Sequence, residues 1–251
     1  MESRRLTLIT MLLLSVFIVV SNLAPHETQL FYRVVNVYPH DPEAFTQGLV
    51  FHNGSLIEST GLYGRSSLRL VELSTGNVTR IVDLPQIYFG EGVTVHDDRV
   101  IQLTWRSHVA FVYNLEFELV GNFSLGTEGW GLTTDGDSLI ISDGSPTLHI
   151  LDPYTYQETH TVTVRDHSSP VYNINELEYV DGKIYANIWR TDRMIIIDLE
   201  TGAVEAYADL SGLRSYLNGV EVDVLNGIAY HEGRLLLTGK FWPLLFEVEI
   251  D

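Results

Sequence analysis

A repeat that occurs five times constrains the fold of this chain more than any other feature. Each copy has a short apolar segment, a turn of Asn, Asp, Glu or Gly, and a second apolar segment. The copies read GLVFHNGSLIES, GVTVHDDRVIQL, GLTTDGDSLIIS, ELEYVDGKIYAN and GIAYHEGRLLLT, and they begin at Gly48, Gly92, Gly131, Glu176 and Gly227. These starting residues are 44, 39, 45 and 51 positions apart. Several short strands per repeat at this period are typical of the blades of a β-propeller.

The segments between the copies predict further strands. L-x-T-G-x-V occurs at 73–78 and at 199–204, where it reads as a turn between two apolar segments. An apolar, β-rich segment at 30–37 precedes the first copy, and the chain after Gly227 has room for only three strands, at 228–230, 234–239 and 244–250. We expect the N-terminal segment to complete the last blade, because this removes two open sheet edges. The prediction is an all-β fold, a five-bladed β-propeller that forms one domain over residues 26–251.

The N-terminus carries a different pattern. Residues 6–20 form an uncharged apolar run that follows Arg4 and Arg5. A membrane span needs about 20 apolar residues, so this shorter run indicates a signal peptide or a signal anchor. We therefore predict that residues 1–25 are such a segment and that the domain is extracytoplasmic, either secreted or membrane-anchored through 6–20. The alternative is a buried helix of the domain.

Charge and cysteine content exclude several classes of function. The chain has 15 basic and 33 acidic residues, a net charge of −18, and such a surface repels nucleic acid. With no cysteine, the chain offers no disulfide, thiolate zinc site or cysteine nucleophile. We expect a monomer without a metal or other cofactor, since a closed, charged propeller needs no partner to cover its edges.

The residue before each copy differs, although the scaffold repeats. Because the innermost strand of each blade begins there, these residues are expected to meet at one mouth of the ring: Gln47, Glu91, Trp130, Asn175 and Asn226. A second set follows at the end of the next strand: Glu58, Trp105, Asp143, Trp189 and Lys240. Three of these lie 13 residues after the start of their copy, namely Trp105, Trp189 and Lys240. Aromatic walls with a few polar groups are typical of a small-molecule site.

Glu91 and Lys240 are the most informative members of these sets. Glu91 stands between two glycines in the segment FGEG at 89–92, where burial against Phe89 would raise the carboxyl pKa toward the range of a proton shuttle. Lys240 is one of only two lysines. The alternative for Lys240 is a structural ion pair with a channel carboxylate. For Gln47 and Asn226, it is hydrogen bonding to the backbone of the inner strands.

No sequence motif of a serine hydrolase or zinc protease is present. Two other classes of function remain open at this point. One is a metal-dependent propeller lactonase or hydrolase, in which a divalent ion would be held by Glu91, Asn175, Asn226 and Asp143. The other is a propeller that binds a partner without catalysis.

Over residues 30–251 the chain resembles the plant- and bacterial-type glutaminyl-peptide cyclotransferases, or glutaminyl cyclases, a family of five-bladed β-propellers. The resemblance rests on segments that occur in the family's order: FTQGL at 45–49, ESTGLYG at 58–64, FGEG at 89–92, LTW at 103–105, GWG at 129–131, INELE at 174–178, NIW at 187–189, NGIA at 226–229 and TGK at 238–240.

This resemblance implies that N-terminal glutamine of peptides or proteins is converted to pyroglutamate with release of ammonia, without an essential metal. It implies that Glu91 is the general acid/base and that the pocket is lined by Gln47, Trp105, Trp130, Asn175, Trp189 and Lys240. We also expect substrate contacts from Phe45 and Phe89, which stand in the same segments. The donor to the developing oxyanion is left open between Lys240, Gln47 and Asn175.

Overall fold

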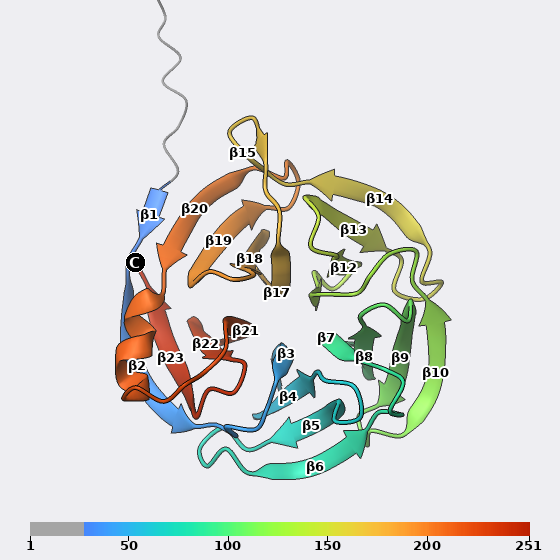
Figure 1. Ribbon diagram of the computed structural model, residues 1–251. Helices are drawn as coiled ribbons and strands as arrows, with labels where there is room; N and C mark the ends of the chain where they lie inside the picture. The colour runs from blue at the N-terminus through green and yellow to red at the C-terminus, as the bar shows by residue number, and fades with distance from the viewer. Residues whose placement is uncertain (1–27) are drawn as a thin grey trace, which may run out of the picture.

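The structure is a computed structural model that describes residues 28–251. Five antiparallel sheets are arranged around a central axis, and the chain passes through them in sequence order (Figure 1). This arrangement confirms the predicted all-β, five-bladed propeller. The predicted signal peptide or anchor, residues 1–25, lies outside the described residues. None of the helices in the described part is long and apolar enough to cross a membrane.

Each blade has four antiparallel strands, and in blades 1 to 4 the first of these along the chain is the innermost. Blade 1 contains β3 (Thr46–His52), β4 (Ser55–Thr60), β5 (Ser67–Val71) and β6 (Val78–Asp83). Blade 2 contains β7 (Gly90–His96), β8 (Arg99–Thr104), β9 (Val109–Asn114) and β10 (Leu119–Ser124). Blade 3 contains β11 (Leu132–Thr134), β12 (Leu139–Ser142), β13 (Thr147–Leu151) and β14 (Glu158–Thr163).

The two remaining blades involve the N-terminal strands. Blade 4 contains β17 (Ile174–Val180), β18 (Lys183–Ile188), β19 (Arg193–Asp198) and β20 (Val204–Asp209), and β1 (Thr28–Leu30) pairs in parallel with β20. Blade 5 contains β21 (Leu225–His231), β22 (Arg234–Gly239) and β23 (Leu244–Ile250). Its outermost strand is β2 (Tyr32–Pro39), which pairs antiparallel with β23.

Two small elements were not expected from the sequence. A short hairpin of β15 (Arg165–Asp166) and β16 (Ser169–Pro170) projects from the outer edge of the ring between blades 3 and 4 (Figure 1). A 3₁₀ helix, η1 (Ser211–Leu217), connects blade 4 to blade 5 and buries Leu213 and Leu217. Neither element has the long hydrophobic periodicity by which helices and strands are recognised.

The hydrophobic core consists of five clusters, one between each pair of neighbouring blades. Side chains alternate along a strand, so the two faces of a blade contact different neighbours. In β8, for example, Val100 packs in the cluster shared with blade 1, while Ile101 packs in the cluster shared with blade 3. Because both faces are covered, the middle strands are largely buried, as in Leu139–Ser142, where all four residues are buried.

Close contact between the innermost strands explains why most copies of the repeat begin with glycine. A Cβ atom at Gly48 would lie 2.5 Å from the Val93 nitrogen, and one at Gly92 would lie 2.6 Å from the Leu132 nitrogen. Any side chain would therefore push neighbouring blades apart. Glu176 is the exception, and its buried carboxylate accepts hydrogen bonds from Leu49 N of blade 1 at 3.1 Å and from Ile228 N of blade 5 at 2.9 Å.

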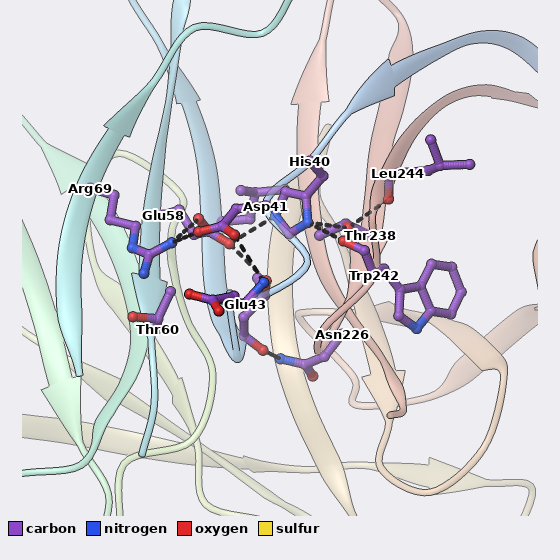
Figure 2. Close-up of polar contacts among 12 residues, drawn as sticks. His40, Asp41, Glu43, Glu58, Thr60, Arg69, Asn226, Thr238, Trp242 and Leu244 are labelled. Atoms are coloured by element: carbon purple, nitrogen blue, oxygen red, sulfur yellow. Dashed lines mark hydrogen bonds and ion pairs between the residues drawn. The ribbon is translucent and has the colours of Figure 1, made fainter. Parts of the chain in front are cut away.

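A buried polar cluster joins blade 5 to blade 1 (Figure 2). His40 follows β2, and its Nε2 lies 3.0 Å from Glu58 Oε1 in β4, while its Nδ1 lies 2.6 Å from the Trp242 carbonyl oxygen. Arg69 lies 2.7 Å from Asp41 and 4.0 Å from Glu58. The expectation that Glu58 lies at the mouth of the ring was therefore wrong. Glu58 lies two residues before the end of β4, and its carboxylate contacts His40 and Arg69 between the two blades.

Candidate active site

In four of the five blades, the residue before the copy lies at a β-bulge. In four blades, the pairing of the first two strands shifts register at this point, between Thr46 and Gly48, Gly90 and Val93, Ile174 and Leu177, and Leu225 and Ile228. A bulge bends its strand locally and redirects a side chain, and bulges are common beside active sites. The repeat seen in the sequence therefore corresponds to a recurring bulge, which directs different side chains toward one end of the ring.

One cavity of about 330 Å³ opens at this end. It is lined by Phe45, Gln47, Phe89, Glu91, Trp105, Trp130, Asn175, Trp189, Arg190, Asp223, Val224 and Lys240. The structure thus brings together all nine residues that were predicted as catalytic or substrate-binding, from all five blades. Their roles in a reaction are a separate question from their position.

The polar side chains lie deep in the cavity. Gln47, Glu91, Asn175 and Lys240 are each 3–4% exposed. Gln47 and Asn175 belong to the inner strands β3 and β17, and Lys240 directly follows β22. Within residues 28–251, the buried Gln47 Oε1 has no hydrogen-bond partner. The cavity therefore presents polar groups that are shielded from bulk water and open toward a ligand.

Aromatic rings form the walls. The rings of Phe45 and Phe89 meet edge to face with centroids 6.1 Å apart, and Phe89 contacts Trp105 at 5.5 Å. Trp130 and Trp189 meet edge to face at 5.4 Å. Edge-to-face contacts of this kind hold rings in defined orientations. The walls are therefore rigid and apolar around the polar groups below them.

Burial raises the pKa of Glu91 well above its usual value. The positive charge of Lys240 and the hydrogen bond from the Gln47 side chain oppose this rise, whereas the negative charge of Glu128 adds to it. The first effect is the largest, because a buried carboxylate loses its hydration. A carboxyl group in this environment keeps its proton to higher pH than an exposed glutamate does, which is the direction that was predicted for Glu91.

The pKa of Lys240 shifts in the opposite direction. Burial lowers the pKa of its ammonium group, while the charges of Glu91 and Asp223 raise it. The Nζ atom lies 4.7 Å from the centroid of the Phe45 ring. In the part of the chain that the structure describes, no carboxylate oxygen lies within 4.0 Å of Nζ. The structural ion pair considered as an alternative for Lys240 is thus not formed, and the ammonium group faces the cavity.

Two other residues expected at the mouth lie elsewhere. Asp143 accepts hydrogen bonds from Thr127 at 2.7 Å and pairs with His149 at 3.1 Å, and it does not line the cavity. Asn226 is fully buried, and its amide donates to the backbone oxygens of Thr46 and Gln47. For Asn226, the structural alternative is therefore correct.

These positions also bear on the metal-dependent alternative. Of the four oxygen ligands that it required, only Glu91 and Asn175 line the cavity. No group of three or more His, Cys, Asp or Glu side chains in residues 28–251 is arranged to hold a metal ion. The cavity instead brings together a buried carboxyl group and an ammonium group, those of Glu91 and Lys240.

Sequence reasoning missed four residues of the site. Arg190, Asp223 and Val224 line the outer part of the cavity, and Glu128 accepts hydrogen bonds from the Trp105 and Trp130 indoles. Arg190 directly follows Trp189 and stacks over its ring at 4.2 Å, so its place after a predicted wall residue was a usable signal. The others lie in connections, where no repeat marks them.

Comparison with known proteins agrees with this geometry. Residues 8–250 match the sequence profile of the glutamine cyclotransferase family. A glutaminyl-peptide cyclotransferase of Arabidopsis thaliana is 42% identical over 226 residues, which span 87% of this chain and 71% of the plant protein. The crystal structure of the Myxococcus xanthus glutaminyl cyclase superposes with a TM-score of 0.84 at 36% identity, covering 90% of this chain and 98% of the bacterial chain. The chain belongs to the glutamine cyclotransferase family.

Proposed function

We propose that this chain is a glutaminyl-peptide cyclotransferase, which converts the N-terminal glutamine of peptides or proteins to pyroglutamate and releases ammonia. Membership of the family supports the reaction, and both relatives described above carry names of this activity. The observation that carries the proposal for the site is the buried Glu91 carboxyl, with its raised pKa, in a cavity with aromatic walls and an ammonium group.

The substrate supplies much of the required proximity. Its α-amine attacks the carbon of its own side-chain amide, and a five-membered ring closes, so the cavity mainly has to select the folded-back conformer. A free α-amine has a pKa of about 7.7–8.0, and a useful fraction is therefore neutral near pH 7. The apolar walls favour this neutral form, because a charged ammonium would lose its hydration there.

Expulsion of ammonia is the harder step. The tetrahedral intermediate cannot release an amide anion, so its nitrogen must first receive a proton. We assign both transfers to Glu91, which accepts a proton from the attacking amine and donates it to the departing nitrogen. The amine loses one proton, the carbon–nitrogen bond to the leaving group breaks, and neutral ammonia departs. Proton transfer by a positioned side chain typically contributes about 10²–10⁴-fold in rate.

The arrangement also suggests how the oxyanion is stabilised. The Gln47 side chain lies against Glu91 and lowers its pKa, so we assign Gln47 to orienting the carboxyl and, through the unpaired Oε1, to accepting a substrate N–H. Lys240 is then the donor to the oxyanion, and Asn175 holds the substrate amide. One preorganised donor of this kind is worth about 2.7–4 kcal/mol in the transition state.

The aromatic walls serve a second purpose in this proposal. Trp130 and Trp189 cover the reacting centre, so water has little access to the side-chain amide. Simple deamidation of glutamine to glutamate, which requires attack by water, is thereby discouraged relative to ring closure. Arg190 and Asp223 are exposed at the outer part of the cavity, and in this proposal the rest of the peptide leaves the cavity beside them.

Incubation of the purified chain with a short peptide that begins with glutamine tests this function. The expected result is loss of the mass of one ammonia, with equimolar ammonia in solution. The same peptide with an acetylated N-terminus is the matched control, because its nitrogen cannot attack. Turnover of neither peptide, with a folded protein, would contradict the proposed function.

We also propose that residues 1–25 direct export or anchor the chain, that the domain is extracytoplasmic and monomeric, and that β2 closes the ring. The apolar run at 6–20 behind Arg4 and Arg5 supports the first point, and the pairing of β2 with β23 supports the last. Fractionation of cells, N-terminal sequencing and light scattering test them. A full-length chain found only in the cytosol would contradict the export proposal.

A further inference from the structure

Glu128 connects two parts of the cavity wall. Its Oε2 atom accepts hydrogen bonds from Trp105 Nε1 at 2.8 Å and from Trp130 Nε1 at 3.1 Å. Trp105 directly follows β8 of blade 2, whereas Trp130 lies just before β11 of blade 3. One carboxylate oxygen therefore sets the orientation of two indole rings that belong to different blades.

This carboxylate lies where the aromatic wall is interrupted. On one side, Phe45, Phe89 and Trp105 form a chain of ring contacts, and on the other Trp130 contacts Trp189. No ring contact links Trp105 directly to Trp130 within residues 28–251. Without Glu128, neighbouring rings would therefore restrain each of these two indoles from one side only.

The position of Glu128 is itself fixed by its surroundings. The adjacent Gly129 donates its N–H to the Trp105 carbonyl oxygen at 3.2 Å, and a Cβ atom there would lie 2.8 Å from the Thr104 carbonyl oxygen. The loop is thus pressed against the end of β8. Arg106 Nε lies 3.2 Å from Glu128 Oε1, and its guanidinium group stacks 3.8 Å from the Trp105 ring centroid.

We propose that Glu128 is a positioning residue for the cyclisation, which holds the Trp105 and Trp130 indoles in the orientation that shapes the cavity around Glu91. This inference rests on the proposed function and adds a residue that touches neither the substrate nor the reacting atoms. Its carboxylate acts through two wall residues, and Arg106 closes the outer side of the same arrangement.

The charge of Glu128 has a second effect. Burial opposes its ionisation, but hydrogen bonds from the Trp130 and Trp105 indoles and from Arg106 outweigh this and lower its pKa. Glu128 therefore remains a carboxylate. The pKa of Glu91 is raised mainly by burial. The charge of Lys240 opposes this rise, and the charge of Glu128 increases it. Removal of the charge thus lowers the pKa of Glu91.

Two substitutions separate the acceptor from the charge. Glu128→Ala removes both, whereas Glu128→Gln retains a carbonyl oxygen that can accept from the indoles. A misplacement of about 1 Å near a reacting centre costs on the order of 10²-fold. We expect kcat/KM of E128A to fall on that scale, with most of the loss in kcat, and E128Q to recover most of it. Glu116→Ala, an exposed glutamate in the β9–β10 turn, is the matched control and should be unchanged.

The pH profile provides a readout that a purely structural role would not move. Two substrates with different α-amine pKa values identify the limb of the kcat/KM profile that belongs to the enzyme. In E128A and E128Q, that limb should move to lower pH, because a neighbouring negative charge has been removed.

The indole N–H signals provide a readout that does not depend on turnover. The chain has four tryptophans, and their signals in ¹⁵N-labelled protein are assigned by single Trp→Phe changes. In E128A the Trp105 and Trp130 signals should shift and exchange faster with solvent. The Trp242 signal, whose N–H donates to the Asp223 carbonyl oxygen at 3.1 Å, should stay in place.

The outcomes distinguish this inference from the proposed function. Unchanged Trp105 and Trp130 signals, or full activity of E128A, would overturn the positioning role even if the wild-type chain cyclises glutamine. Equal losses in E128Q and E128A would show that charge, not the hydrogen-bond acceptor, is what matters, and would also overturn it. If E128A does not fold, E128Q still supplies the pH profile, and its Trp105 and Trp130 signals should stay close to those of the wild type because the acceptor is retained; a large change in these signals would then overturn the positioning role. Absence of wild-type turnover would refute the function instead, while the signals would still test the contacts.

Discussion

The carboxyl group of Glu91 and the ammonium group of Lys240 face the same cavity from blades 2 and 5, and each favours the charged form of the other. Burial acts against both charges, raising the pKa of Glu91 and lowering that of Lys240. Their mutual attraction opposes these shifts without a direct ion pair. Glu91 consequently keeps its proton to higher pH, and Lys240 loses its proton at lower pH, than exposed side chains of the same kind.

Glu91→Gln is expected to abolish most of the activity and to leave the fold intact. The amide keeps the shape of the side chain but cannot carry a proton between the two nitrogens, so kcat should fall by at least about 10²–10⁴-fold. Ammonia release from a glutamine-initiated peptide measures the loss, and circular dichroism and thermal unfolding verify the fold. Activity close to that of the wild type would eliminate the proposed proton shuttle.

Lys240→Met is expected to shift the pH dependence of activity as well as to lower kcat. Loss of the positive charge raises the pKa of Glu91 further, so the acidic limb set by that carboxyl should move to higher pH. If Lys240 stabilises the oxyanion, kcat falls by about 10²–10³-fold. Lys240→Arg keeps the charge and should leave the limb near its original position. A K240M profile that coincides with that of the wild type contradicts the coupling.

The His40–Glu58 pair between blades 5 and 1 should make stability depend on pH (Figure 2). Burial lowers the pKa of His40, but the charge and hydrogen bond of Glu58 outweigh it and leave the pKa raised. For Glu58, burial is outweighed by His40 and Arg69, and the pKa is lowered. The contribution of His40 is complete below pH 6.5 and is lost as pH rises through its folded-state pKa. That of Glu58 is complete above pH 4.5 and is lost as pH falls through its folded-state pKa.

Both contributions are thus present between pH 4.5 and 6.5, where Glu58→Gln should have its largest effect. Breaking a buried pair typically costs about 3–5 kcal/mol. Urea unfolding at about pH 5.5 and pH 9 measures the free energy of unfolding, and the loss should be smaller at the higher pH. Glu43→Gln removes an exposed carboxylate near the same cluster and is the control. Equal losses at both pH values would be inconsistent with a charged His40.

Glu178→Gln is expected to stabilise the protein at alkaline pH. Burial raises the pKa of Glu178 to about 8, against hydrogen bonds from Tyr230 N and Thr133. The folded protein therefore holds a proton that the unfolded chain has released, so this contribution is complete below pH 4.5 and lost as pH rises through about 8. The wild-type free energy of unfolding should fall by about 1.4 kcal/mol per pH unit more steeply than that of the variant in this interval.

Denaturation curves at a series of pH values measure this difference in slope. In E178Q the amide oxygen of the substituted side chain can still accept from Tyr230 N, which lies 2.7 Å from Glu178 Oε1 in the native chain, so the variant should fold. Glu200→Gln, in an exposed turn of the same blade, should retain the wild-type slope. Parallel curves for wild type and E178Q would mean that Glu178 is already ionised in the folded state.

Chelators are expected to leave turnover unchanged. The carboxylate of Asp143 is bound to His149 and Thr127, and Asn226 is hydrogen-bonded to backbone, so the oxygen ligands of the metal-dependent alternative are dispersed. Dialysis against EDTA followed by the ammonia assay checks this. Inactivation by EDTA that a divalent ion reverses would favour a metal-dependent hydrolase.

The number of blades, the place of the inner strands and most of the polar and aromatic residues of the cavity could be predicted from the sequence, whereas Arg190, Asp223 and Val224 were missed. In four of the five blades the repeat marks a register shift between the first two strands, which redirects the side chain at that point; in blade 5 this side chain, Asn226, contacts backbone instead of the cavity. The position before each copy was therefore visible in the chain, and so were the three residues 13 positions after its start. Glu58 and Asp143 were placed wrongly because the distance along the chain from a repeat does not fix which neighbours a side chain will meet.

The five-bladed ring and most of its polar and aromatic lining are thus determined by local patterns in the sequence, because strand periodicity and turn chemistry act between residues close in sequence. Other contacts depend on how the blades pack against one another. They are the pairing of His40 with Glu58, the hydrogen bonds from Asn226 to backbone oxygens, and the bridge that Glu128 forms between Trp105 and Trp130. Those contacts join residues from different blades, and their energies depend on distances and burial that exist only when the ring is assembled.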